Sequence, residues 1–159
     1  MPGTRPILHI LLLLVVLSPQ SVSFGQEPQT KMEKFSAGLV TVPSGYKTER
    51  VIGPDFDVDY VIPEGAKLNE TDVMLGIYTG SFPSFSPPTK GVKTEEGHFG
   101  GKRFKWHLWE TTADGKTGYH REALVKLEGG QWVWHIFVKA PDKQRMEELM
   151  GILRSYRAE

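Results

Sequence analysis

The chain has 159 residues, with 19 basic and 19 acidic side chains, no net charge at neutral pH and no cysteine. The charge balance argues against nucleic acid or an anionic membrane surface as the partner, because both require a clustered excess of Lys and Arg. The lack of cysteine excludes disulfides, thiol catalysis and thiolate metal sites. The folded part of the chain therefore has to be stabilised by its hydrophobic core.

The N-terminus has the pattern of a secretory signal peptide. Arg5 precedes an apolar run at residues 7–17, which is too short to span a bilayer because a spanning helix needs about 20 residues. Small residues stand at the third and first positions before Gln26, as a cleavage site requires. We expect residues 1–25 to be a signal peptide of a periplasmic or secreted protein, with no transmembrane segment in the mature chain. An uncleaved N-terminal anchor is the alternative.

The next segments predict the start of a single domain. Residues 26–34 are polar and lack periodicity, which predicts a flexible lead-in to one globular domain at residues 35–159. Residues 39–42 predict a short strand, because a Pro-Ser-Gly turn signal follows them. Residues 73–79 are more continuously apolar and predict a central strand.

Residues 55–62 alternate between apolar and acidic side chains. The apolar members are Phe56, Val58, Tyr60 and Ile62, and the acidic members are Asp55, Asp57 and Asp59. This pattern predicts a half-buried strand whose aspartates face water. A calcium loop is excluded, because it needs Gly at its sixth and Glu at its twelfth position, where this sequence has Tyr60 and Ala66.

The C-terminal third predicts three antiparallel strands joined by two tight turns. The strands are expected at residues 103–110, 119–128 and 131–138. An Asp-Gly and a Gly-Gly pair between them are hairpin signals. Two tight turns at these pairs place Trp106 opposite Ala123 and Trp134 opposite Val125, with all the large apolar side chains on one face. A slip of one residue would invert that face, so the agreement supports the register.

The last segment, residues 142–157, changes to helical spacing of its apolar residues. These residues are Met146, Leu149, Met150, Leu153 and Tyr156. Asp142 is expected to be the N-cap. The predicted fold class is α+β: an antiparallel β-sheet with a C-terminal amphipathic helix packed on one face.

The candidate binding residues lie in the unusual stretch GIYTGSFPSFSPP at residues 76–88. Tyr78, Phe82 and Phe85 stand here among prolines, which stiffen the chain toward polyproline II. The segment has two sensible outcomes: it caps the core and buries both Phe rings, or it forms a rigid aromatic lip around a binding site. We expect capping, because exported monomers rarely expose such patches.

A second candidate site is a metal site on the other face of the three predicted strands. The register places His107 opposite Glu122 and Trp109 opposite His120, with the two His on diagonally neighbouring positions. Two His and one Glu match a zinc or non-haem iron site in type. His135 is two strands from His107 and offset by two residues, about 12 Å away, and is left out. A solvent-facing His–Glu pair is the simpler interpretation.

The order of elements, with Val-Pro-Ser-Gly-Tyr at residues 42–46 and Ile-Leu-Arg-Ser at residues 152–155, is similar to exported proteins of the PsbP-like type. The resemblance implies an antiparallel sheet flanked by helices on both faces, and it implies nothing about activity.

From these patterns we expect an exported, non-enzymatic domain that binds a protein or a small ligand, without a cofactor and without nucleic acid. The alternative is a metal-dependent hydrolase or oxygenase that uses His107, His120 and Glu122 with one transition metal ion.

Overall fold

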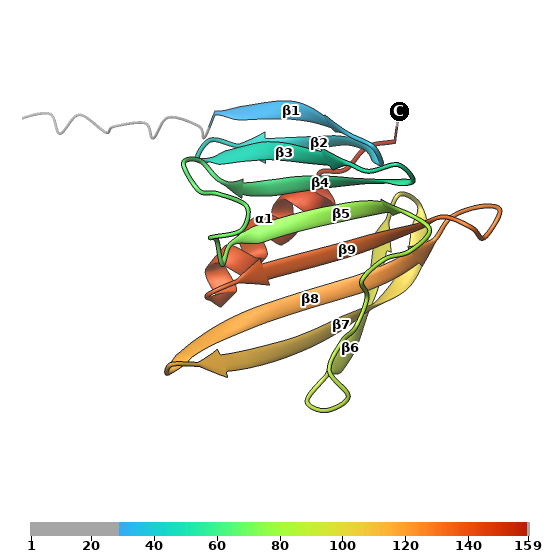
Figure 1. Cartoon of the computed structure of the whole chain (residues 1–159). Coiled ribbons are helices and arrows are strands. Elements are labelled where there is room, and N and C mark those ends of the chain that lie inside the picture. Colours follow the sequence, from blue (N-terminus) through green and yellow to red (C-terminus); the bar gives the residue numbers. More distant parts are fainter. Residues whose placement is uncertain (1–28, 159) are drawn as a thin grey trace, which may run out of the picture.

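A computed structural model describes residues 29–158 of the chain. The predicted signal peptide, its cleavage site and the first three residues of the lead-in lie outside this part. Within it, nine strands precede one helix, α1 (Lys143–Arg154) (Figure 1). The strands are β1 (Thr30–Phe35), β2 (Gly38–Pro43), β3 (Tyr46–Ile52), β4 (Phe56–Pro63), β5 (Met74–Gly80), β6 (Lys93–Phe99), β7 (Lys102–Ala113), β8 (Lys116–Lys126) and β9 (Val133–Ala140). The described part is thus mostly antiparallel sheet, followed by a C-terminal helix.

Seven of the strands form one antiparallel sheet in the order β3-β4-β5-β9-β8-β7-β6, and β1 and β2 form a separate hairpin. β5 lies between β4 and β9 in the middle of the sheet, which confirms the predicted central strand. The chain leaves β5 and reaches the far edge strand β6 through a segment that crosses one face of the sheet in front of β9 and β8 (Figure 1). This crossing segment, residues 81–92, contains the Phe-rich and Pro-rich stretch.

The predicted register of the C-terminal strands is confirmed. His107 pairs with Glu122 across β7 and β8, and Val125 pairs with Trp134 across β8 and β9. Both residues of the Asp-Gly turn have positive φ, 51° at Asp114 and 71° at Gly115, as a tight two-residue hairpin turn requires. Trp106 is buried in the core, and Trp134 packs against the same core cluster.

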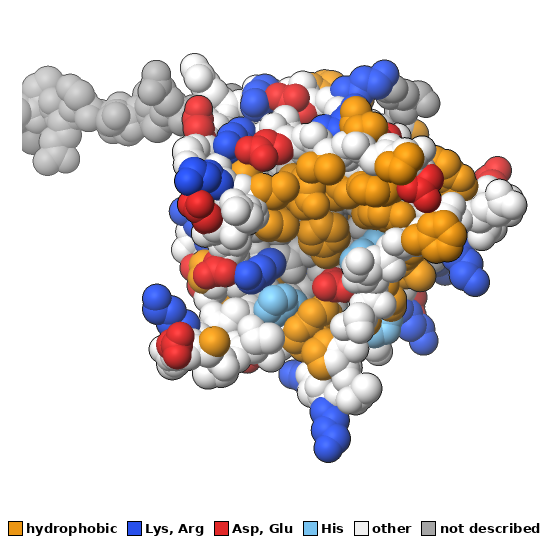
Figure 2. Space-filling model, in the orientation of Figure 1, with side chains coloured by type: hydrophobic (Ala, Val, Ile, Leu, Met, Phe, Trp, Pro, Cys, Tyr) orange, Lys and Arg blue, Asp and Glu red, His pale blue; other side chains and the backbone are white. Residues whose placement is uncertain are grey.

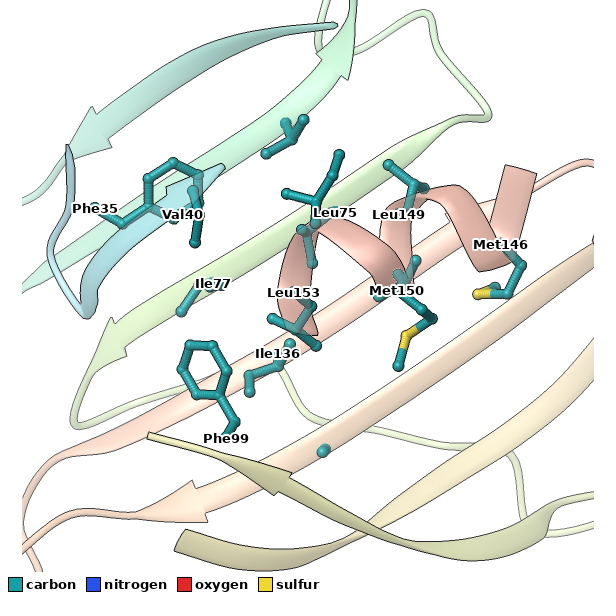
Figure 3. Close-up of a cluster of buried hydrophobic side chains, with 14 of the residues drawn as sticks. Phe35, Val40, Leu75, Ile77, Phe99, Ile136, Met146, Leu149, Met150 and Leu153 are labelled. Carbon is teal, nitrogen blue, oxygen red and sulfur yellow. The ribbon is translucent and has the colours of Figure 1, made fainter. Parts of the chain in front are cut away.

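The core lies between the sheet and α1. Buried side chains of the helix, Leu149, Met150 and Leu153, belong to the same cluster as Leu75 on β5 and Ile136 on β9 (Figure 3). The predicted N-cap is confirmed, because the Asp142 side chain accepts a hydrogen bond from the backbone N–H of Arg145 at 2.8 Å. The β1–β2 hairpin covers one end of this core with buried Phe35, Val40 and Val42.

Two expectations about the N-terminal half are wrong. Residues 30–34 form most of β1 and pair with β2, although the sequence predicts a flexible lead-in there. Asp59 is 3% exposed, although the sequence predicts that it faces water. Its carboxylate accepts hydrogen bonds from the Ser36 backbone N–H and from the Arg50 guanidinium, so the charge is compensated by direct partners. Asp59 thereby connects the end of β1 to the main sheet.

The face of the sheet away from α1, called the open face from here on, is not covered by a helix of the described residues. The resemblance to PsbP-like proteins implies a helix on each face, whereas in the part that the structure describes the only helix lies behind the sheet as drawn in Figure 1. Membership of that family stays a prediction.

No helix among the described residues is long and apolar enough to cross a membrane.

Candidate functional site

The open face has its own group of large apolar side chains. Val58 on β4 pairs with Tyr78 on β5, and Tyr78 pairs with His135 on β9. Two residues before Tyr78 on β5, Gly76 pairs with Tyr60 on β4 and with Phe137 on β9. Because side chains alternate along each strand, these residues share one face, opposite to the buried Ile77 and Ile136. Figure 2 shows hydrophobic side chains gathered over β4, β5 and β9 on this face, with a histidine and an acidic residue beside them.

Glycines beneath the rings explain how the aromatic side chains lie on the sheet. A Cβ atom at Gly76 would stand 2.0 Å from Cζ of Phe137, so the Phe137 ring occupies the space above that glycine. A Cβ at Gly80 would stand 2.7 Å from Cζ of Tyr78. Glycine in a strand permits this close approach of a neighbouring ring. The rings of Phe137 and Tyr78 therefore lie over the sheet backbone.

The rings surround a cleft of about 560 Å³. Phe56 stacks on Tyr78 with centroids 5.6 Å apart, and Tyr60 meets Phe137 edge to face at 5.9 Å. We call this site the aromatic cleft; it is lined by Asp55, Phe56, Val58, Tyr60, Tyr78, Phe82, Ser84, Glu122, His135 and Phe137. Its volume is in the range of small-molecule sites, roughly 300–1,000 Å³, and such sites are mostly apolar with a few polar groups.

A polar pair, a buried histidine and a partly exposed glutamate, lies at the β8–β9 side of the aromatic cleft. His135 is 5% exposed, and its Nε2 lies 3.0 Å from Oε2 of Glu122 on the neighbouring strand. His135 was left out of the predicted metal site because it lies two strands from His107. The structure shows that its partner is instead Glu122. The pair offers the cleft a carboxyl group and an imidazole held in place by each other.

The two Phe residues of the Phe-rich segment lie in different surroundings. Phe85 folds back onto the open face and packs edge to face between His107, at 5.3 Å, and His135, at 5.5 Å. Phe82 is 80% exposed, and its backbone N–H donates a hydrogen bond to the Tyr78 hydroxyl at 3.0 Å. The expected burial of both rings is therefore wrong for Phe82, while Phe85 is half-buried against the two histidines and does not join the core cluster. Tyr78 and Phe82 line the aromatic cleft, and Phe85 covers the histidines beside it.

The three residues predicted for a metal site have other contacts. The pairing of Trp109 with His120 is confirmed, and the two rings stack at 5.1 Å. His120 Nε2 lies 3.0 Å from the Thr111 hydroxyl, while Glu122 contacts His135. His107 has a buried Nδ1 that finds no hydrogen-bond partner among residues 29–158. Among the described residues, no three His, Asp or Glu side chains lie together in a group that could hold a metal ion.

Burial lowers the pKa of the His120 imidazole, and the charge of Lys139 lowers it further, against opposing effects of Glu122 and Asp72. Because the folded pKa is below the unfolded value of about 6.5, the unfolded chain binds more protons in mildly acidic solution. We expect this residue to lower the free energy of unfolding as pH falls below about 6.5, and His120→Gln to weaken that dependence. Denaturant unfolding between neutral and mildly acidic pH measures the slope, and an NMR titration midpoint of His120 at or above the ordinary value would contradict the expectation.

A second cleft of about 560 Å³ lies near the free edge of the sheet, between β6, β7, β8 and the start of α1. We call it the edge cleft. Its charged groups are of both signs, and Arg121 lies 3.7 Å from Glu95 and 3.8 Å from Glu147. Apart from Arg121, the Lys and Glu side chains that line it are exposed. Such long side chains change conformation readily and do not specify one class of ligand.

Comparison of the sequence with protein-family models and with curated proteins gives no match. The site is therefore interpreted from its own geometry.

Proposed function

We propose that this chain is an exported, non-enzymatic domain that binds a small ligand in the aromatic cleft. The observation that carries the proposal is the arrangement of aromatic rings from β4, β5 and β9 over strand glycines, around a volume suited to a small molecule. In this proposal the amphipathic C-terminal helix packs on the opposite face and supplies the rigid core, so the part of the open face that the crossing segment leaves uncovered is available for binding. The proposal of export rests on the predicted signal peptide and on the resemblance to PsbP-like proteins, which are exported.

The contacts of the residues that line the aromatic cleft suggest a role for each of them. Phe137, Tyr60 and Phe56 provide apolar surface, Tyr78 holds the start of the crossing segment through its hydroxyl, and Phe82 forms an exposed rim. A ligand that covers such rings is stabilised by the removal of apolar surface from water, about 25 cal/mol per Å².

Binding of the neutral, environment-sensitive dye N-phenyl-1-naphthylamine tests the proposal. We expect the dye to gain fluorescence with the native protein, and Phe137→Ala to weaken its Kd by about tenfold, because loss of one ring contact of about 1.5 kcal/mol has that effect. Trp132→Ala is the matched control, because Trp132 is 44% exposed and lies outside the cleft lining. Circular dichroism establishes that both variants are folded. Equal Kd values of the dye for Phe137→Ala and Trp132→Ala would contradict the proposal.

The alternative proposal is a metal-dependent hydrolase or oxygenase at His107, His120 and Glu122. The unpartnered Nδ1 of His107 is the feature that supports it. Elemental analysis of protein purified without chelators and then incubated with zinc or iron(II) tests it. Stoichiometric metal that is lost in His107→Ala would support this function, and the absence of stoichiometric metal would remove it.

A further inference from the structure

We propose that the ligand of the aromatic cleft is an organic cation, an amine or a quaternary ammonium group attached to an apolar body. This inference rests on the proposed function, because it names the chemical class of ligand for the same site.

The charge of the cleft lining favours a cationic ligand. Asp55 and Glu122 are acidic, and no Lys or Arg is among the described residues that line the aromatic cleft. The one lining side chain that can become positive is His135, and its Nε2 is already 3.0 Å from Glu122. An anionic ligand would meet two acidic groups without a free cation, whereas a cationic ligand would meet groups of opposite sign.

The orientation of the aromatic rings also favours a cationic ligand. The Phe137 ring lies above Gly76, where a Cβ would be 2.0 Å from its Cζ and 2.3 Å from Cε2. With the sheet backbone beneath it, the ring has its opposite side available to the cleft. Phe56 and Tyr78 form a stacked pair whose planes differ by 20°. The face of an aromatic ring carries the negative part of its quadrupole and attracts a cation within about 6 Å of the centroid.

The aromatic rings and the acidic groups occur together in the lining of the aromatic cleft. Aromatic rings alone would bind any apolar ligand, and acidic groups alone would bind any cation. Rings from three adjacent strands with a carboxyl group at the rim, Asp55, and another at the β8–β9 side, Glu122, are the combination that binds alkylammonium groups, because the methyl groups contact the rings while the charge interacts with ring faces and carboxylates.

Three probes of nearly equal shape and different charge test the inference. Choline is positive, 3,3-dimethylbutan-1-ol is its neutral isostere, and 3,3-dimethylbutanoate is negative. Each is titrated into the native protein while ring resonances of Tyr60, Tyr78 and Phe137 are followed by NMR. We expect choline to bind at least about tenfold tighter than the neutral isostere, and the anion to bind weakest.

Variants locate the charge preference. Asp55 is exposed, so Asp55→Asn is not expected to affect folding, and it should reduce the ratio of choline to alcohol affinity. Tyr60→Leu keeps apolar volume, removes a ring, and should reduce the same ratio. Asp72→Asn is the control, because Asp72 is an exposed acidic residue that pairs with Lys139 outside the cleft lining.

The outcomes separate this inference from the proposed function. Equal affinity for choline and the alcohol, with dye binding intact, would overturn the cation inference and leave the binding proposal standing. Absence of dye binding together with absence of all three probes would overturn both. A charge preference that disappears in Asp72→Asn and persists in Asp55→Asn would also overturn the inference, because the preference would then arise elsewhere on the surface.

Discussion

Leu149→Ala should lower the free energy of unfolding by about 2–5 kcal/mol, the usual range for removing a fully buried Leu. Leu149 is 0% exposed and lies in the cluster between α1 and the sheet (Figure 3). Alanine is the better helix former, so any loss measures packing and not helix propensity. Because small domains have about 5–15 kcal/mol of total stability, the variant should unfold at clearly lower denaturant concentration.

The control for this prediction is Glu147→Ala on the same helix, where the exposed side chain makes long contacts with Arg154 at 3.4 Å and with Arg121 at 3.8 Å. That variant should change the free energy of unfolding by no more than about 0.5 kcal/mol. Urea unfolding followed by circular dichroism compares the two. A loss below about 1 kcal/mol in Leu149→Ala would contradict the tight helix–sheet core, given the values typical of buried Leu.

Asp59→Ala should have the second largest effect, a loss of about 1.5–3 kcal/mol, because hydrogen bonds to a charged group contribute about that much. The substitution removes the acceptor for the Ser36 backbone N–H, at 2.6 Å, and the partner of Arg50. The Arg50 side chain is 37% exposed, so water can solvate it in the variant, and the effect should stay below that of a fully buried pair.

Asp57→Ala is the matched control two residues earlier on β4. Asp57 is more exposed and accepts one hydrogen bond, from the Ser36 hydroxyl at 3.2 Å. Thermal unfolding of the two variants should show a much larger decrease in Tm for Asp59→Ala. Equal decreases would mean that the buried carboxylate does not anchor the β1–β2 hairpin as the contacts indicate.

The C-terminal third could be predicted from sequence because its signals are local. The Asp-Gly turn fixes the register of β7 against β8, and alternation confirms it over many residues. Asp142 and the apolar spacing after it specify the start of α1 in the same way. The helix ends at Arg154, three residues before the expected end, because Ser155 caps it and Arg157 instead makes a β-bridge with Leu39.

Strands β3 and β6 were missed because few of their side chains are buried. In β6 only Gly97 and Phe99 are buried, and in β3 only Tyr46. An edge strand of this kind has no clear alternation, and its position is set by backbone pairing with β4 or β7. β1 was missed for the same reason, since only Phe35 of its six residues is buried.

The composition of the open face was only partly predictable. Alternation identified Phe56, Val58 and Tyr60 as one surface, but it could not show that this surface faces away from α1, because that depends on the order of strands in the sheet. A usable signal was present in β9, where Phe137 and His135 alternate with Trp134 and Ile136. A strand with large apolar residues on both faces indicates either a second covering layer or a binding surface. The role of Gly76 beneath Phe137 depends on contact between strands, and sequence spacing alone does not reveal it.

The central claim, a ligand cleft on the open face, is tested most directly by assigned aromatic NMR spectra recorded during titration with N-phenyl-1-naphthylamine. We predict saturable shifts of the Tyr60, Tyr78 and Phe137 rings, with the Tyr119 ring, which lines the edge cleft, unaffected. Saturable shifts at Tyr119 with unchanged Tyr60, Tyr78 and Phe137 resonances would place binding in the edge cleft and contradict the claim.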